Sequence, residues 1–161
     1  MNVKLPNDAN LTFRTIDGKV VNPVAHSFEM IRKHPDCKIY VGSDSQNHRR
    51  LTKYATVIAY RYGTRGAHYI YTTWKYKPKI RIIKERLIQE TMVTMDVVQR
   101  LLDADVPIYA VDFDFNDEKE TLSSELVSFA IGWTQGLGLR GHAKPQEMVA
   151  TRAANHLANN K

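Results

Sequence analysis

Hydrophobic and polar positions follow each other along the chain in an order that predicts strands first and helices afterwards. Residues 38–43 have the pattern of a buried strand, and every second residue from Tyr54 to Tyr62 suits a long strand over residues 51–62. A turn over residues 63–66 leads to another strand over residues 67–74. Three strands joined by short connections predict an antiparallel meander.

Apolar residues at helical spacing follow in further stretches. Asn22 and Pro23 predict a helix start, and residues 82–102 carry the longest helical pattern. Residues 108–115 predict a buried strand, residues 122–135 a helix, and Lys144 with Pro145 the start of a last helix. We expect irregular structure over residues 1–21, with a tight turn at Asp17 and Gly18, a polar loop over residues 46–50, and turns over residues 136–141. The order predicts an α/β fold with one mixed sheet.

Length and composition indicate a single soluble domain. The chain has 161 residues, of which 43% are hydrophobic and 25% charged, enough to bury a core without cross-links. We expect one domain over residues 1–161, in which residues 1–36 are an N-terminal extension containing a helix. Cys37 is the single cysteine and excludes an internal disulfide. Without a secretory or membrane-spanning pattern, we expect a cytoplasmic protein with no membrane partner.

Asp44 is the first candidate for chemistry, because it follows directly on the predicted strand 38–43. A carboxylate at the end of a buried strand is costly to desolvate, and it usually has a charged or metal partner. Ser45 and Gln46 come next and are expected to support Asp44 or to contact a substrate.

Three further acids are candidates for the same site. Asp112 and Asp114 point to one face of the strand predicted over residues 108–115, unless they simply meet water at its polar end. On the long helix, Glu90 lies about 60° from the centre of the apolar stripe and Glu85 about 160° from it. Glu90 therefore either reaches the sheet or pairs with a nearby cation as a boundary residue.

Such a group of carboxylates repels itself unless cations neutralise it. Oxygen ligands suit Mg²⁺ or Mn²⁺, and one or two such ions support the attack of water on a phosphodiester.

Basic residues favour a polyanionic partner. The 23 lysines and arginines exceed the 17 aspartates and glutamates by six, and six cations fall within residues 74–86. Aromatic residues interleave with them and can stack on unpaired bases, although a solvated connector would have the same composition. The candidate nucleic-acid contacts in this segment are Trp74, Lys75, Lys77 and Lys79. Near Asp44 they are Arg49 and Arg50.

Several short motifs resemble one family. Residues 42–46 (Gly-Ser-Asp-Ser-Gln), residues 86–90, residues 114–116, Gly136 with Gly138, Lys144 with Pro145, and residues 150–155 are similar to the YkuK-type predicted RNase H-related nucleases. The resemblance covers roughly residues 25–158. It implies a ribonuclease H-like domain, in which an antiparallel three-strand meander plus parallel strands is flanked by helices, and a nuclease activity.

The resemblance also ranks the site residues. It favours Asp114 over Asp112, which stands where the family is expected to have a histidine and is a second ligand at best. Asn155 stands where ribonucleases H have a fourth acid, so it implies a weaker ligand that carries no charge. His142 either assists departure of the phosphate, as a loop histidine does in some ribonucleases H, or is a solvated loop residue.

These observations leave three functional hypotheses. The first is a divalent-metal-dependent nuclease acting on RNA, an RNA–DNA hybrid or structured DNA, with Asp44, Glu90 and Asp114 as catalytic metal ligands. The second is a weak or inactive nucleic-acid-binding module, and the third a protein-interaction scaffold. The sequence does not indicate an oligomeric state.

Overall fold

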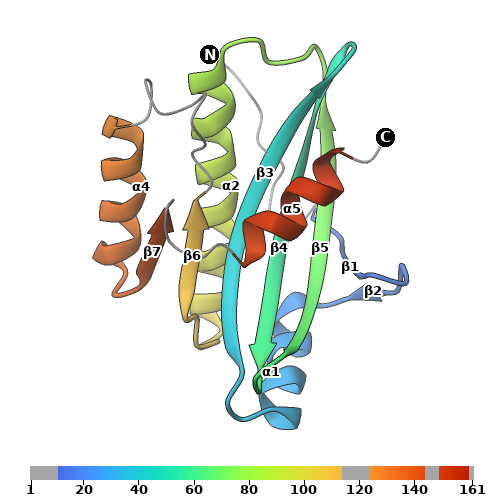
Figure 1. Cartoon of the computed structure of the whole chain (residues 1–161), viewed down its shortest axis with the longest axis vertical. Helices are drawn as coiled ribbons and strands as arrows, with labels where there is room; N and C mark the ends of the chain where they lie inside the picture. Colours follow the sequence, from blue (N-terminus) through green and yellow to red (C-terminus); the bar gives the residue numbers. More distant parts are fainter. Residues whose placement is uncertain (1–10, 114–123, 144–148, 160–161) are drawn as a thin grey trace.

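The computed structural model describes residues 11–113, 124–143 and 149–159, which form one sheet with helices on both faces (Figure 1). The strands are β1 (Phe13–Thr15), β2 (Val20–Val21), β3 (Lys38–His48), β4 (Leu51–Tyr62), β5 (Gly66–Tyr76), β6 (Ala110–Phe113) and β7 (Arg140–Ala143). The helices are α1 (Pro23–Lys33), α2 (Ile83–Asp103), α4 (Ser124–Gly136) and α5 (Ala150–Asn159). Within these ranges, no helix combines the length and the apolar character that crossing a bilayer requires.

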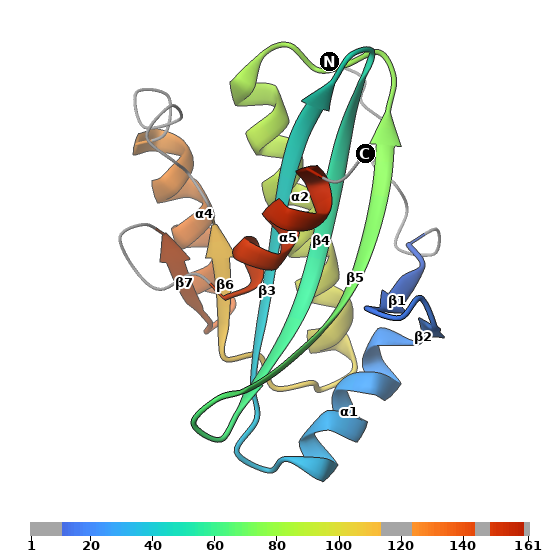
Figure 2. The same ribbon diagram turned by 45° about the vertical axis from the view of Figure 1, so that its right-hand side comes forward.

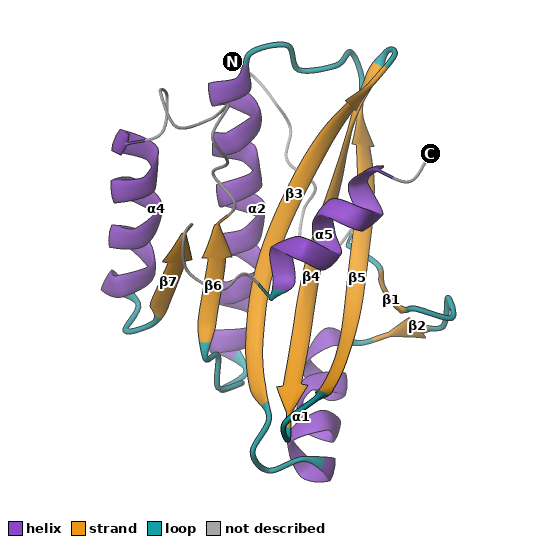
Figure 3. Cartoon of the chain, in the orientation of Figure 1, coloured by secondary structure: helices purple, strands orange, loops and turns teal. Residues whose placement is uncertain are grey.

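The seven strands lie in the order β2-β1-β5-β4-β3-β6-β7. Long antiparallel ladders join β3 to β4 and β4 to β5, which confirms the predicted meander. Strand β6 runs parallel to β3, and β7 runs parallel to β6. Parallel neighbours need crossover connections. Helix α2 lies in the connection from the meander to β6, and α4 lies in the connection from β6 to β7 (Figure 3). The predicted mixed α/β sheet is confirmed.

Helices cover the two faces of the sheet unequally. Helix α2 lies behind β3, and α5 crosses the opposite face over the upper part of β3 and β4 (Figures 1 and 2). The larger apolar core includes Val41, Ile58 and Leu87 on the α2 side. A smaller core on the α5 side joins Ala55 and Val57 to Ala154.

Local signals explain several element boundaries. The side chain of Asn22 accepts hydrogen bonds from the N–H groups of Val24 and Ala25, and Pro23 is the first residue of α1, as predicted. Gly18 has a φ of 89° in the turn between β1 and β2, where its N–H bonds to the carbonyl of Thr15. The predicted turn at Asp17 and Gly18 is confirmed.

Three sequence-based expectations were wrong. Residues 1–21 are not irregular throughout, because they contain β1 and β2, which have too few residues to show an alternating pattern. Strand β3 continues through the predicted polar loop to His48, because β4 supplies backbone partners as far as Leu51. Strand β7 begins within the predicted turns over residues 136–141, because β6 offers an open edge for pairing. The predicted helix start at Lys144 and Pro145 lies outside the described residues.

Candidate active site

Asp44 lies inside β3 and not at its end. It pairs with Ala55 of β4, and Ala55 packs with Ala154 and Ala158 of α5. Because side chains alternate between the faces of a strand, Asp44 lies on the α5 face, where it is only 2% exposed. The carboxylate is thus enclosed between the sheet and a helix, which makes its ionised form costly unless cations or hydrogen bonds stabilise it.

Gly42 allows α5 to lie this close to the sheet. A Cβ at Gly42 would be 2.9 Å from Cγ2 of Thr151 and 3.1 Å from Cβ of Ala150. Thr151 is 1% exposed, and its Oγ1 has no hydrogen-bond partner in the described part of the chain. The glycine two residues before Asp44 therefore has a packing role: it permits the contact that covers the acid.

Glu90 lies on the opposite face of β3. It is 5% exposed on α2, and its Oε1 accepts a hydrogen bond from Oγ of Ser45. Thr94, one turn further along α2, donates to Oγ of Ser43 over 2.7 Å. Residues 43 and 45 thus contact α2, whereas the residue between them faces α5. The structure places Glu90 beside the strand that carries Asp44, but it does not bring the two carboxylates onto one face.

A buried polar group adjoins Glu90. The hydroxyl of Tyr54 donates to Oε1 of Gln89 over 2.7 Å, and burial followed by the charge of Glu90 raises the pKa of Tyr54. Gln89 is 3% exposed, because α2 packs its flank over β4, where Tyr54 reaches it. Nε of Arg86 is also buried, without a hydrogen-bond partner among the described residues.

Asp112 connects three elements. Its Oδ2 accepts the N–H groups of Val149 and Ala150 at the start of α5, both over 2.7 Å, and its Oδ1 lies 3.4 Å from Nδ1 of His142. Burial raises the pKa of this carboxyl group, although the two N–H groups and His142 act in the opposite direction. One oxygen of Asp112 is therefore engaged in holding α5 on the sheet.

His142 is a strand residue, so its interpretation as a solvated loop histidine was wrong. It pairs with Asp112 between β7 and β6, and its side chain is 20% exposed. The rings of Tyr40 and Tyr109 lie near it, with centroid distances of 6.3 and 6.5 Å. Its sequence neighbours Gly141 and Ala143 gave little strand signal.

Asn155 lies on the flank of α5. The buried face of this helix consists of Ala150, Thr151, Ala154 and Ala158, whereas Asn155 is half-buried. Its Oδ1 accepts a hydrogen bond from Nδ2 of Asn159 on the next turn. The oxygen that would ligate an ion is therefore used within the helix.

The basic segment over residues 74–86 lies against the β3–β4 hairpin, which carries Arg49 and Arg50. Thr52 donates to Asn47 over 2.6 Å and accepts the N–H of Ile80 over 2.8 Å, while Asn47 donates to the carbonyl of Ile80 over 3.0 Å. The N–H of Lys79 bonds to the carbonyl of Arg50. These bonds fix the connector between β5 and α2 to the β3–β4 hairpin. Sequence reasoning missed Asn47 and Thr52, whose role depends on this long-range contact.

Two lysines on this part of the sheet are direct cross-strand neighbours. Lys53 pairs with Lys75, and burial, followed by the charge of Lys75, lowers the pKa of Lys53. Like charges placed opposite each other are unfavourable unless an anion lies between them. Lys53 also pairs with Gln46 of β3, on the side away from Lys75, and Gln46 is half-buried.

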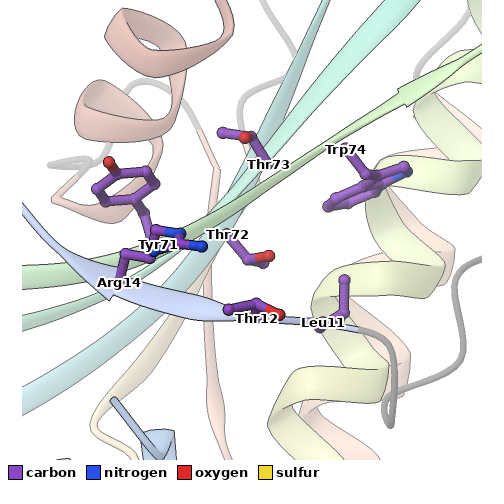
Figure 4. A pocket seen from close by; sticks show the side chains of 7 residues that line it. All are labelled: Leu11, Thr12, Arg14, Tyr71, Thr72, Thr73 and Trp74. Carbon is purple, nitrogen blue, oxygen red and sulfur yellow. The ribbon is translucent and has the colours of Figure 1, made fainter. Parts of the chain in front are cut away.

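Trp74 is less available than its position in the basic segment suggests. Its ring stacks on Tyr54 with a centroid distance of 5.0 Å and an interplanar angle of 4°. It also borders a groove of about 230 Å³ between β1 and β5, in which Arg14 and Tyr71 lie at one end and Trp74 at the other (Figure 4). Ser45 is also less available, because it is fully buried against Glu90.

Only part of the candidate metal site falls within the described residues. Asp44 and Glu90 are buried oxygen donors, which fits Mg²⁺ or Mn²⁺ in chemical type. Asp114 lies outside the described residues. In the part of the chain that the structure describes, no three histidine, cysteine or acidic side chains form a group that could hold a metal ion.

Comparison with known proteins identifies the family. The family model described as Ribonuclease H-like matches residues 20–159, whereas no curated protein and no solved structure matches the chain. The match covers most of the chain, agrees with the mixed sheet and confirms the resemblance seen in the motifs. It supports a nuclease-like or nucleic-acid-binding module. The chain belongs to the ribonuclease H-like family.

Proposed function

We propose that the protein is a divalent-metal-dependent nuclease that hydrolyses phosphodiester bonds of RNA, an RNA–DNA hybrid or structured DNA. The parallel pairing of Ser43 with Phe113 carries the proposal. Asp44 and Asp114 are the next residues in the sequence after this pair, and we take both as ligands. The family match supports the same chemistry.

We also take residues 1–161 as one domain, with residues 1–36 as its N-terminal extension.

Asp44, Glu90 and Asp114 are the proposed catalytic ligands of one or two Mg²⁺ or Mn²⁺ ions. The hydrogen bond from Ser45 holds the carboxylate of Glu90 against β3 on the face opposite Asp44, so coordination of one ion by both acids requires the Glu90 side chain to turn toward Asp44. Asp112 and Asn155 are assigned weaker roles, because two N–H groups at the start of α5 hold Oδ2 of Asp112, and because Asn155 has no charge and its one side-chain oxygen accepts from Asn159. When bound, the ions would activate water and stabilise charge on the phosphate.

The basic segments would position the nucleic acid. Arg49 and Arg50 lie on the β3–β4 hairpin, Lys75 near the end of β5, and Lys77 and Lys79 on the connector fixed to the hairpin. Their charges can neutralise phosphates. Gln46, beside Lys53, extends this surface toward Asp44. Ser45 and Trp74 would act indirectly, through Glu90 and Tyr54. His142, held beside Asp112, would assist release of the cleaved phosphate.

A second function is a binding module with little or no turnover. The observation that favours it is the hydrogen bond from Asn159 to Asn155, because it occupies the oxygen at the position of the fourth acid. A metal site that lacks one charge and one oxygen donor would hold a second ion weakly. Such a protein would still bind nucleic acid through its lysines and arginines.

Cleavage and binding assays on the same samples would separate the two functions. We would incubate the full chain with Mn²⁺ and labelled RNA, RNA–DNA hybrid or branched DNA, and compare Asp44→Asn and Glu90→Gln with Glu85→Gln. The nuclease proposal predicts Mn²⁺-dependent cleavage that falls by at least about 100-fold in the first two variants and persists in Glu85→Gln. Salt-sensitive binding without cleavage of any substrate would favour the second function.

A further inference from the structure

A cationic cleft lies at the start of β3, away from the candidate active site. It has a volume of about 540 Å³ and is lined by Asp36, Lys38, Tyr40, Arg61, Tyr62, Gly63 and Tyr109. Lys38 precedes Asp44 by six residues, so the two Cα atoms are about 20 Å apart along the strand. Helix α5 crosses the upper part of this face, and no described helix covers the lower part (Figures 1 and 2).

Cations converge on this cleft. Lys38 and Arg61 pair directly between β3 and β4, so their side chains leave the same face of the sheet. Nζ of Lys38 lies 4.6 Å and Cζ of Arg140 4.8 Å from the centroid of the Tyr109 ring. Like charges gathered in this way repel one another, and an anion placed among them would relieve the repulsion.

The carboxylate in the lining is held by the rim of the cleft. Among the described lining residues, Asp36 is the only acid, and its Oδ2 accepts the N–H of Gly63 over 2.7 Å. This bond holds the β4–β5 turn that forms one rim of the cleft. Lys38 and Arg61 therefore outnumber the acid in the lining, and Arg140 adds a third positive charge beside it.

Aromatic rings hold the walls of the cleft in place. Tyr62 stacks on His34 with a centroid distance of 3.6 Å and an interplanar angle of 8°. The ring of Tyr109 lies 5.3 Å from that of Tyr40, and its hydroxyl accepts a hydrogen bond from Nη1 of Arg140 over 2.9 Å. Arg140 is thereby positioned before any ligand arrives. A volume of this size lies within the range of about 300–1,000 Å³ typical of small-ligand pockets.

We propose that this cleft binds the phosphate of a nucleotide unit, with Lys38, Arg61 and Arg140 surrounding the phosphate and the tyrosines contacting the sugar or base. The nucleotide is either free or part of a strand that also reaches the candidate active site on the same face. The shared chemistry is a phosphate attached to an aromatic base. The site does not depend on cleavage, because none of its residues belongs to the proposed metal site.

The test measures binding of 5′-AMP, adenosine and a 5′-labelled oligoadenylate by the full chain at low salt, without divalent ions. The variants are Lys38→Ala and Arg140→Ala, with Arg65→Ala on the neighbouring exposed turn as a matched control. We expect 5′-AMP or the oligonucleotide to bind, and each of the two site variants to weaken that binding by about tenfold while Arg65→Ala does not. Adenosine should bind more weakly than 5′-AMP.

The outcomes distinguish the ligand source and the two proposals. Saturable binding of 5′-AMP identifies a free nucleotide, whereas Lys38-dependent binding of the oligonucleotide alone identifies a strand. Binding of neither ligand, or binding that Lys38→Ala and Arg140→Ala leave unchanged, would overturn the proposal. Asp44→Asn should bind like the wild type, so a failure of the nuclease proposal does not affect this result.

Discussion

Ser45 donates a hydrogen bond to Glu90, and this bond joins the strand residue beside Asp44 to helix α2. Both side chains are buried, so the interaction takes place away from water. A buried carboxylate that loses a hydrogen-bond donor destabilises the folded state, because its desolvation is no longer offset by that bond. The bond therefore ties the packing of α2 to the position of a proposed metal ligand.

Ser45→Ala should lower the free energy of unfolding by about 1–3 kcal/mol, because it leaves Oε1 of Glu90 without this donor. It should also reduce Mn²⁺-dependent cleavage, since the carboxylate is no longer held against β3. Urea denaturation and the cleavage assay would measure the two effects. Ser128→Ala, at an exposed position of α4, is the control, and an equal effect of both substitutions on stability would refute the role of the bond.

Gly42→Ala should destabilise the protein by about 1–3 kcal/mol, because the added methyl group meets Cγ2 of Thr151. Combining it with Thr151→Ala should cost less than the sum of the two single substitutions, since the closest contact of the added methyl group is removed. Thermal unfolding of the three variants measures this coupling. Gly132→Ala on α4, where a Cβ has no neighbour within 4 Å, should not destabilise. Strict additivity would contradict the proposed close contact.

A histidine pair should make stability depend on pH. Nε2 of His26 lies 2.8 Å from Nε2 of His68, and burial is the main cause that lowers the pKa of each ring. Because the folded state favours the neutral forms, their stabilising contribution is present above the unfolded pKa of about 6.5 and is lost as the pH falls below it. The charged groups acting on the pair are Asp17, Lys19, Glu29 and Lys33.

Urea denaturation between pH 7.5 and pH 5, in the presence of a chelator, would test this dependence. The free energy of unfolding should fall with pH less steeply in His26→Gln/His68→Gln than in the wild type. His156→Gln, at an exposed position of α5, should keep the wild-type slope. Identical slopes in the wild type and the double variant would show that the pair does not titrate in this range.

Thr52→Val should loosen the connector that carries Lys77 and Lys79, because it removes the bonds of Thr52 to Asn47 and Ile80. We expect weaker binding of nucleic acid at constant charge. Lys77→Ala/Lys79→Ala should in addition reduce the slope of log K against log salt concentration by roughly 0.7–0.9 per lost phosphate contact. Fluorescence anisotropy at several salt concentrations would measure both quantities. Unchanged binding in all these variants would exclude the connector from the nucleic-acid interface.

The sequence predicted the features that depend on local patterns. Alternation over residues 51–62 and the cap at Asn22 were sufficient to place β4 and α1, because these signals lie within the elements themselves. The helical wheel placed Glu90 on the flank of the apolar stripe and left open whether it reaches the sheet, and the structure buries it. What failed depended on long-range pairing, as in the extension of β3 and the strand that contains His142.

The candidate site was harder to predict than the fold. The candidate acids Asp44, Glu90 and Asp112 are buried, but spacing along the chain does not tell which face of β3 each acid contacts. The capping of α5 by Asp112 joins residues 37 and 38 positions apart, and no local pattern records such a contact. The same holds for the bonds between Thr52 and Ile80.

A crystal of the full chain soaked in Mn²⁺ tests whether the carboxylate of Asp44 binds a divalent metal ion. Anomalous scattering locates the manganese without reference to the protein atoms. We predict at least one peak within bonding distance of a carboxylate oxygen of Asp44, about 2.0–2.3 Å, and no such peak in Asp44→Asn. A soaked wild-type crystal with no manganese at Asp44 would contradict the claim.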